Sequence, residues 1–149
     1  HASEKAFWDV IKLSKAPIIC SHSSSMAMCK HDRNLTDEQL KALAQNGGVA
    51  QVCLLDRYIN EDYKNASLTD AIEHIDHMVK VAGIDHVGIG SDFDGGGGII
   101  GCESDNDFIQ ITVKLIEKGY TEEDIAKIWG GNLMRVLDEV QATASVKTL

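Results

Sequence analysis

Apolar residues along this chain fall into two alternating patterns, one typical of amphipathic helices and the other of short buried strands. Helical spacing predicts helices over 3–14, 37–45, 67–82, 105–117 and 132–141, with a further short helix after Thr121. Continuous apolar runs between them predict buried strands over 17–21, 48–55 and 86–91. Ser3, Thr36 and Thr121 are suitable N-caps, and glycines follow several of the helices.

This alternation predicts an α/β fold in which parallel strands are covered by helices. His1 precedes the first helix at the place where the end of a strand would lie. Counting that strand, the chain would hold about four βα units, which is half of a (β/α)₈ barrel. No linker rich in Gly, Ser or Pro divides the chain. We therefore expect a partial barrel domain over 1–141 and a C-terminal tail over 142–149.

The chain is acidic and has no run of Lys or Arg. Of its 149 residues 14 are basic and 23 acidic, so the formal net charge is 14 − 23 = −9. We therefore expect no nucleic-acid partner, because a phosphate backbone attracts basic surfaces. Cys20, Cys29, Cys53 and Cys102 lack the C-x-x-C spacing of a thiolate zinc site. The apolar runs are far shorter than the roughly 20 residues that cross a bilayer.

Four polar side chains stand near predicted strand ends, where parallel α/β folds place their reacting groups. His22, Tyr58 and Asp92 each follow a different predicted strand, and His1 occupies the corresponding place before the first helix. Two imidazoles and a carboxylate brought together from separate strands are a suitable nucleus for a metal-assisted hydrolase.

Other interpretations of these residues stay open at this level. A single His at a strand end is more often a hydrogen-bonded structural residue than a ligand. The segment SHSSS over 21–25 also fits a nucleophilic serine cluster, although it lacks the G-x-S-x-G elbow. The segment DFDGGGG over 92–98 resembles part of an EF-hand loop, but it lacks the third oxygen ligand and the final Glu. It also lacks the Lys of a P-loop.

The remaining histidines carry weaker signals; they are His31, His74, His77 and His86. His74 and His77 are three residues apart on a predicted helix. Their charged neighbours at 73, 76 and 80 predict a solvated helix face. H-x-x-H without a nearby Glu base is a weak metal motif.

Four blocks of the sequence, taken together, resemble a known family. They are S-H-S-S at 21–24, H-x-R-N at 31–34, G-x-D-F-D-G at 90–95 and G-G-N at 130–132. In this order and at this spacing they resemble the second half of the membrane (renal-type) dipeptidases. These are zinc metallopeptidases of the amidohydrolase-like (β/α)₈ barrel group. The resemblance runs essentially the whole length of the chain.

The resemblance implies a role for five residues. The His of S-H-S-S and a His ending the preceding strand bind the second of two zincs in that family, which implies His22 and His1 as metal ligands here. Asp92 corresponds to the proton-handling carboxylate beside the metal-bridging water. Arg33 corresponds to the Arg that binds the polar groups of the dipeptide, and Tyr58 resembles a residue that lines the pocket. Asp94 and the glycines after it are expected to shape the turn.

The resemblance also implies what this chain does not contain. In the family an H-x-D pair holds the first zinc, a Glu bridges both metals and a further His contacts substrate, and none of these has a counterpart here. We therefore expect part of a binuclear zinc site that cleaves a small dipeptide, inactive without an N-terminal half of the barrel. A homodimer is a family-level expectation. The alternative is a non-catalytic α/β barrel module, or an inactive fragment, that binds a partner through an open sheet edge.

Overall fold

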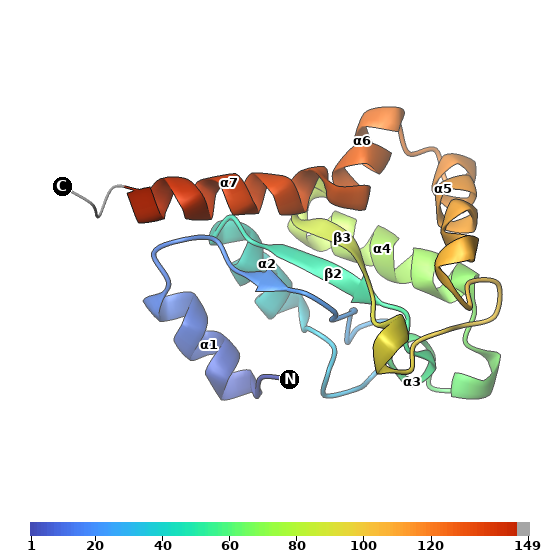
Figure 1. The fold of residues 1–149 in the computed structure, drawn as a ribbon. Coiled ribbons are helices and arrows are strands. Elements are labelled where there is room, and N and C mark those ends of the chain that lie inside the picture. The colour runs from blue at the N-terminus through green and yellow to red at the C-terminus, as the bar shows by residue number, and fades with distance from the viewer. Residues whose placement is uncertain (146–149) are drawn as a thin grey trace.

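A computed structural model describes residues 1–145 as helices that alternate with three parallel strands (Figure 1). In chain order the elements are α1 (Glu4–Leu13), β1 (Ile19–Cys20), α2 (Asp37–Gln45), β2 (Val49–Cys53), α3 (Asp56–Ile59), α4 (Leu68–Ala82), β3 (Val87–Ser91), α5 (Phe108–Glu117), α6 (Glu122–Ala126) and α7 (Asn132–Ser145). The predicted α/β alternation is therefore confirmed, and its arrangement is that of a partial (β/α)₈ barrel.

The sheet has the order β1-β2-β3, and both neighbouring pairs are parallel. The pairing of β2 with β3 shifts by one residue at the end of the strands, where Val52 faces Ile89 but Cys53 faces Ser91. Gly90 is the residue passed over, and a Cβ there would collide with the carbonyl oxygen of Ser21. Such a bulge bends the strand and changes the direction of the residues that follow it.

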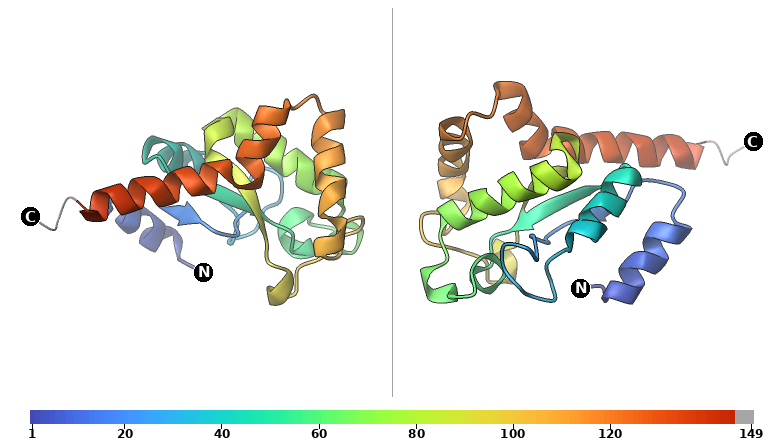
Figure 2. Two further views of the ribbon diagram at one scale, coloured as in Figure 1. Left: turned by 45° about the horizontal axis from the view of Figure 1, so that its top comes forward. Right: turned by 180° about the vertical axis from the view of Figure 1, so that it is seen from behind.

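Helices α2 and α4 lie side by side behind the sheet, as the view from behind shows (Figure 2). Their buried faces carry Leu40, Leu43, Ile72, Ile75 and Met78, each at most 1% exposed. These side chains pack against the apolar strands, and α5 adds Ile111 and Leu115 to the same core. Burial of this apolar surface is the main force that holds helices and sheet together.

Helix α7 crosses the end of the sheet at which the strands begin (Figures 1 and 2). The amide of Asn132, the Asn of the G-G-N block, donates to the carbonyls of Ile84 at 2.7 Å and Val87 at 2.8 Å. Arg135 donates to the carbonyl of Gly47 at 2.8 Å. The G-G-N block is therefore at the opposite end of the strands from the candidate site. Across the described part of the chain, no helix combines the length and hydropathy that a membrane span requires.

Several predicted elements differ from the structure in extent, the first strand and the last helix among them. The strand predicted as buried over 17–21 is reduced to Ile19–Cys20, and Ile19 is 47% exposed. It is an edge strand of the sheet, so along one edge no strand among the described residues pairs with it. Helix α7 continues to Ser145, four residues beyond the predicted end of the domain. The rest of the predicted tail, 146–149, lies outside the described residues.

Candidate active site

The SHSSS segment follows β1 and is hydrogen-bonded to the neighbouring strand. The Ser23 N–H donates to the carbonyl of Gln51 at 2.8 Å. The Ser24 hydroxyl donates to the carbonyl of Cys53 at 3.1 Å and lies 3.2 Å from the Cys53 N–H, which donates to it. Ser24 and Ser25 are both 0% exposed. These two serines fix the path of the chain, so the structure favours a scaffolding role for them over a nucleophilic one.

His74 contradicts the prediction of a solvated helix face, because it is only 1% exposed. Its Nδ1 accepts a hydrogen bond from the Ser25 N–H at 3.0 Å, and its Nε2 lies 2.9 Å from the carbonyl of Ile59. An accepting Nδ1 leaves the proton on Nε2, so the ring is the neutral tautomer that donates to Ile59. Burial lowers the pKa of His74. Its role is to hold the SHSSS segment in place.

His22 is presented by this segment next to His1, and both line one cavity. The two ring centroids are 5.1 Å apart. Nδ1 of His22 lies 2.8 Å from the Ser21 hydroxyl, whereas its Nε2 is buried and has no hydrogen-bond partner. A buried ring nitrogen without a partner costs free energy unless something else binds it. A metal ion would supply that partner, with the Ser21 hydroxyl accepting from Nδ1–H as ligating histidines require.

The residues present could supply two ligands of a metal site, but not a complete set. His1 and His22 offer two imidazoles, and a catalytic zinc needs about three protein ligands and an open position. Among residues 1–145 there is no group of three or more His, Cys, Asp or Glu side chains arranged to hold a metal. The donor set therefore fits zinc in kind but is incomplete in number.

Arg33 and Tyr58 lie in contact with each other. The Arg33 guanidinium carbon is 5.4 Å from the centroid of the Tyr58 ring, and one of its NH groups donates to the phenol at 3.5 Å. The other terminal nitrogen of Arg33 is buried without a partner. Asn34 supports the pair by donating to the carbonyl of Tyr58 at 2.8 Å. A partly buried guanidinium with one unused, buried donor is suited to bind a carboxylate or another anionic oxygen.

Asp92 follows β3 directly after the bulge. Ser91 and Asp92 both have left-handed backbones, with φ of 47° and 73°, a conformation that is uncommon for non-glycine residues. The Asp92 carbonyl accepts from the N–H groups of Gly95 at 3.1 Å and Gly97 at 2.8 Å. Asp94 is exposed in this turn. The glycines therefore shape the turn around Asp92, as the sequence predicted.

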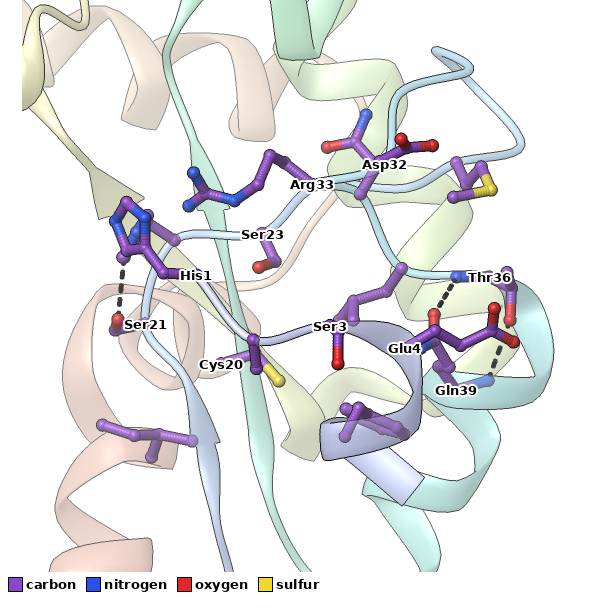
Figure 3. A pocket seen from close by; sticks show the side chains of 17 residues that line it. His1, Ser3, Glu4, Cys20, Ser21, Ser23, Asp32, Arg33, Thr36 and Gln39 are labelled. Carbon is purple, nitrogen blue, oxygen red and sulfur yellow. Dashed lines mark hydrogen bonds between the residues drawn. The ribbon is translucent and has the colours of Figure 1, made fainter. Parts of the chain in front are cut away.

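One cavity of about 850 Å³ brings together His1, His22 and Arg33. It opens between α1, β1 and the start of α2 (Figure 3). Tyr58 and Asp92 are not among its lining residues. Tyr58 contacts Arg33, which does line the cavity. Asp92 contacts Cys53, which in turn is hydrogen-bonded to Ser24 in the segment that carries His22.

Cys53 is the site residue that the sequence interpretation missed. Its thiol donates to Asp92 Oδ2, with 3.6 Å between sulfur and oxygen. Burial is the main cause that raises the pKa of the Cys53 thiol to about 12, so the S–H donor is present at neutral pH. Within its apolar run Cys53 resembles an ordinary core residue. The only available signal was its position two residues before the predicted strand ended.

The comparison with protein families covers the whole chain. Residues 1–149 match the family described as membrane dipeptidase (peptidase family M19). Two relatives are dipeptidase ataJ of Aspergillus terreus, 41% identical over 97% of this chain, and dipeptidase tcpJ of Claviceps purpurea, 36% identical over 97%. The chain spans 36% and 34% of their lengths.

Solved structures give the same result. The probable dipeptidase PvdM from Pseudomonas aeruginosa superposes with a TM-score of 0.88 at 31% identity, over 94% of this chain and 49% of that one. A metallopeptidase from Rhodobacter sphaeroides, liganded with a phosphinate mimic of the dipeptide L-Ala-D-Ala, also has a TM-score of 0.88 at 31% identity. The superposition covers 93% of this chain and 40% of the Rhodobacter sphaeroides chain. The chain belongs to the membrane dipeptidase family of metallopeptidases, peptidase family M19.

Proposed function

We propose that this chain is the C-terminal part of a binuclear zinc dipeptidase and carries half of its active site. The observation that supports this most directly is the buried, unpartnered Nε2 of His22 beside the ring of His1. It lies in the same cavity as Arg33, whose guanidinium also has an unpartnered buried nitrogen. A metal ligand and an anion binder in one cavity are the pair that peptide hydrolysis needs.

His1 and His22 would hold one zinc, and the remaining ligands would come from the part of the barrel that precedes this chain. Bound zinc supplies a hydroxide nucleophile near neutral pH and polarises the peptide carbonyl. The Ser21 hydroxyl orients the His22 ring, and the Ser24 and Ser25 bonds keep its backbone in place. This chain would therefore contribute His22 as an oriented ligand, with His1 beside it.

Arg33 and Asp92 would act on the substrate. The free NH group of Arg33 would bind the developing oxyanion or a carboxylate of the dipeptide, while Tyr58 holds the guanidinium plane. Asp92 would take a proton from the attacking water and pass it to the leaving amine as the C–N bond breaks. The proposed substrate is a small dipeptide, because the family and the relatives that this chain matches are dipeptidases.

The edge of the sheet supports a barrel that continues beyond this chain. Ile19 on edge strand β1 is 47% exposed, and Val10 and Leu13 on the adjacent α1 are 46% and 76% exposed. An uncovered strand edge beside apolar side chains invites pairing with another strand. We propose that the strand that leads to His1 in the complete barrel pairs with the free edge of β1. The alternative of a non-catalytic module that binds a separate partner uses the same edge.

The experiment compares this chain with an extended protein, defined as the same chain preceded by the strands that complete the barrel. Zinc content is measured by elemental analysis, and hydrolysis is assayed with L-Ala-D-Ala and L-Ala-L-Ala. We expect about two zincs and turnover only in the extended protein. Asp92→Asn should lose turnover and keep its zinc, whereas His22→Ala should lose zinc.

The control is His77→Gln, which changes a partly buried histidine that is bonded to Asp37 and is not among the residues that line the cavity. It should retain zinc and turnover. Activity that survives the loss of both His1 and His22 would exclude them as metal ligands. An extended protein that folds but neither binds zinc nor hydrolyses dipeptides would favour the non-catalytic module.

A further inference from the structure

Cys53 occupies the last position of β2, between the segment that carries His22 and the turn that carries Asp92. It is 0% exposed. Its backbone N–H and carbonyl both bond to the Ser24 hydroxyl, at 3.2 Å and 3.1 Å. Ser24 is two residues from His22 along the chain. The position of Cys53 is therefore fixed relative to the histidine proposed as a metal ligand.

The Cys53 thiol reaches across the bulge to Asp92. Its S–H donates to Oδ2 of the carboxylate over 3.6 Å, an ordinary length for a bond in which sulfur is the donor. The shift of register between β2 and β3 at Cys53 makes Ser91 its direct partner, which brings Asp92 to this side of the strand end. Without the bulge, Gly90 would stand opposite Cys53.

The other oxygen of the carboxylate is confined as well. Oδ1 of Asp92 lies so close to Gly95 that a Cβ at residue 95 would collide with it. Two hydrogen bonds from the glycine turn hold the Asp92 carbonyl, and its backbone is left-handed. The Asp92 carboxylate thus receives a hydrogen bond at Oδ2, and its Oδ1 lies against Gly95, where no side chain would fit. Together these two contacts favour one orientation of the carboxylate.

We propose that Cys53 is a positioning residue, which orients the Asp92 carboxylate relative to the His22 segment through its thiol on one side and its backbone on the other. The inference rests on the proposed function, in which Asp92 carries the proton. A carboxylate free to rotate would meet the attacking water less often in the productive geometry, and small misplacements of a reacting group are costly in rate.

The test uses the extended protein and three variants. Cys53→Ala removes the donor, Cys53→Ser keeps a hydroxyl donor, and Cys102→Ala removes a second thiol that is also 0% exposed but bonds to no site residue among those described. We expect Cys53→Ala to lower kcat by about tenfold to hundredfold with little change in KM, since Arg33 and Tyr58 bind substrate. Cys53→Ser should restore most of kcat. Cys102→Ala should keep kcat.

Melting temperature and zinc content are measured on every variant. If Cys53→Ala lowers the melting temperature no more than Cys102→Ala and keeps its zinc, the fall in kcat is not a packing effect. Equal kcat in Cys53→Ala and Cys102→Ala would overturn the inference, as would a Cys53→Ser variant no better than Cys53→Ala. Asp92→Asn distinguishes the two proposals, because an active Asp92→Asn variant contradicts the proposed function itself. An inactive Asp92→Asn beside a fully active Cys53→Ala contradicts only the role of Cys53.

Discussion

The Ser25 N–H donates a hydrogen bond of 3.0 Å to Nδ1 of His74, and this bond ties helix α4 to the segment that presents His22. The other ring nitrogen of His74 bonds the carbonyl of Ile59 at 2.9 Å. One buried imidazole therefore joins three parts of the chain that are distant in sequence. The candidate site depends on a residue that has no contact with the cavity.

His74→Ala should destabilise the fold by about 2–4 kcal/mol, because it leaves a cavity and two buried backbone groups without partners. Urea unfolding of the extended protein measures this change. His77→Ala is the control, since His77 is on the same helix but partly exposed and bonded to Asp37. Equal stabilities for the two variants would contradict the bridging role of His74.

Stability should also fall as the pH drops below about 6.5, the ordinary pKa of histidine. Burial, the largest cause, lowers the pKa of folded His74, and His77 acts in the same direction while Asp70 and the bond to Ile59 oppose it. The unfolded chain therefore binds this proton at a higher pH than the folded chain, so unfolding becomes more favourable as pH falls. At pH 7.5 both forms are neutral and the effect is absent.

Urea unfolding between pH 7.5 and pH 5 measures this dependence. The wild-type protein should lose more stability over this range than His74→Ala, which has no imidazole at that position. Parallel pH profiles for the two proteins would show that His74 does not contribute to the acid sensitivity.

Gly95→Ala should reduce kcat strongly while substrate binding is retained, because the new Cβ would collide with the Asp92 carboxylate. Gly96→Ala is the matched control in the same turn. Gly96 has a φ of +95°, but a Cβ there would meet nothing within 4 Å. We expect Gly96→Ala to cost about 1 kcal/mol of stability from backbone strain and to keep most of kcat. A larger loss of kcat in Gly96→Ala than in Gly95→Ala would contradict the steric argument.

Arg33→Lys should raise KM for dipeptides by about tenfold or more. Lysine keeps the charge but cannot stack on Tyr58 and offer a planar pair of donors at once. Arg57→Lys is the control, because the Arg57 side chain is 65% exposed and pairs only loosely with Asp56 at 3.7 Å. Steady-state kinetics on the extended protein separate KM from kcat. An unchanged KM in Arg33→Lys would remove Arg33 from the substrate-binding residues.

Much of the fold could be predicted from local pattern. The helices over 37–45 and 67–82 were predicted within one residue of α2 and α4, because each has a capping residue, an apolar stripe and a glycine or asparagine at its end. Strands β2 and β3 followed from apolar runs. The short helix α3 had no such pattern, since its four residues are too few for a period to show.

His74 shows how a neighbour-based interpretation failed although the sequence held the answer. Residues adjacent in a helix point in directions about 100° apart, so charges at 73 and 76 say little about the face of 74. Ala71 and Met78 lie three residues before and four after His74, and both are buried. The helical period therefore placed His74 on the buried face.

The sequence by itself determined the α/β class, most of the helices and strands, and the places of His22, Tyr58 and Asp92 after successive strands, because these depend on local periodicity and on the polarity of parallel strands. Only the tertiary structure decided which of these side chains meet. The thiol of Cys53 at Asp92 and the ring of Tyr58 beneath Arg33 arise from pairing between distant strands, a bulge of one residue and side-chain rotamers. These are long-range properties, and no local pattern encodes them.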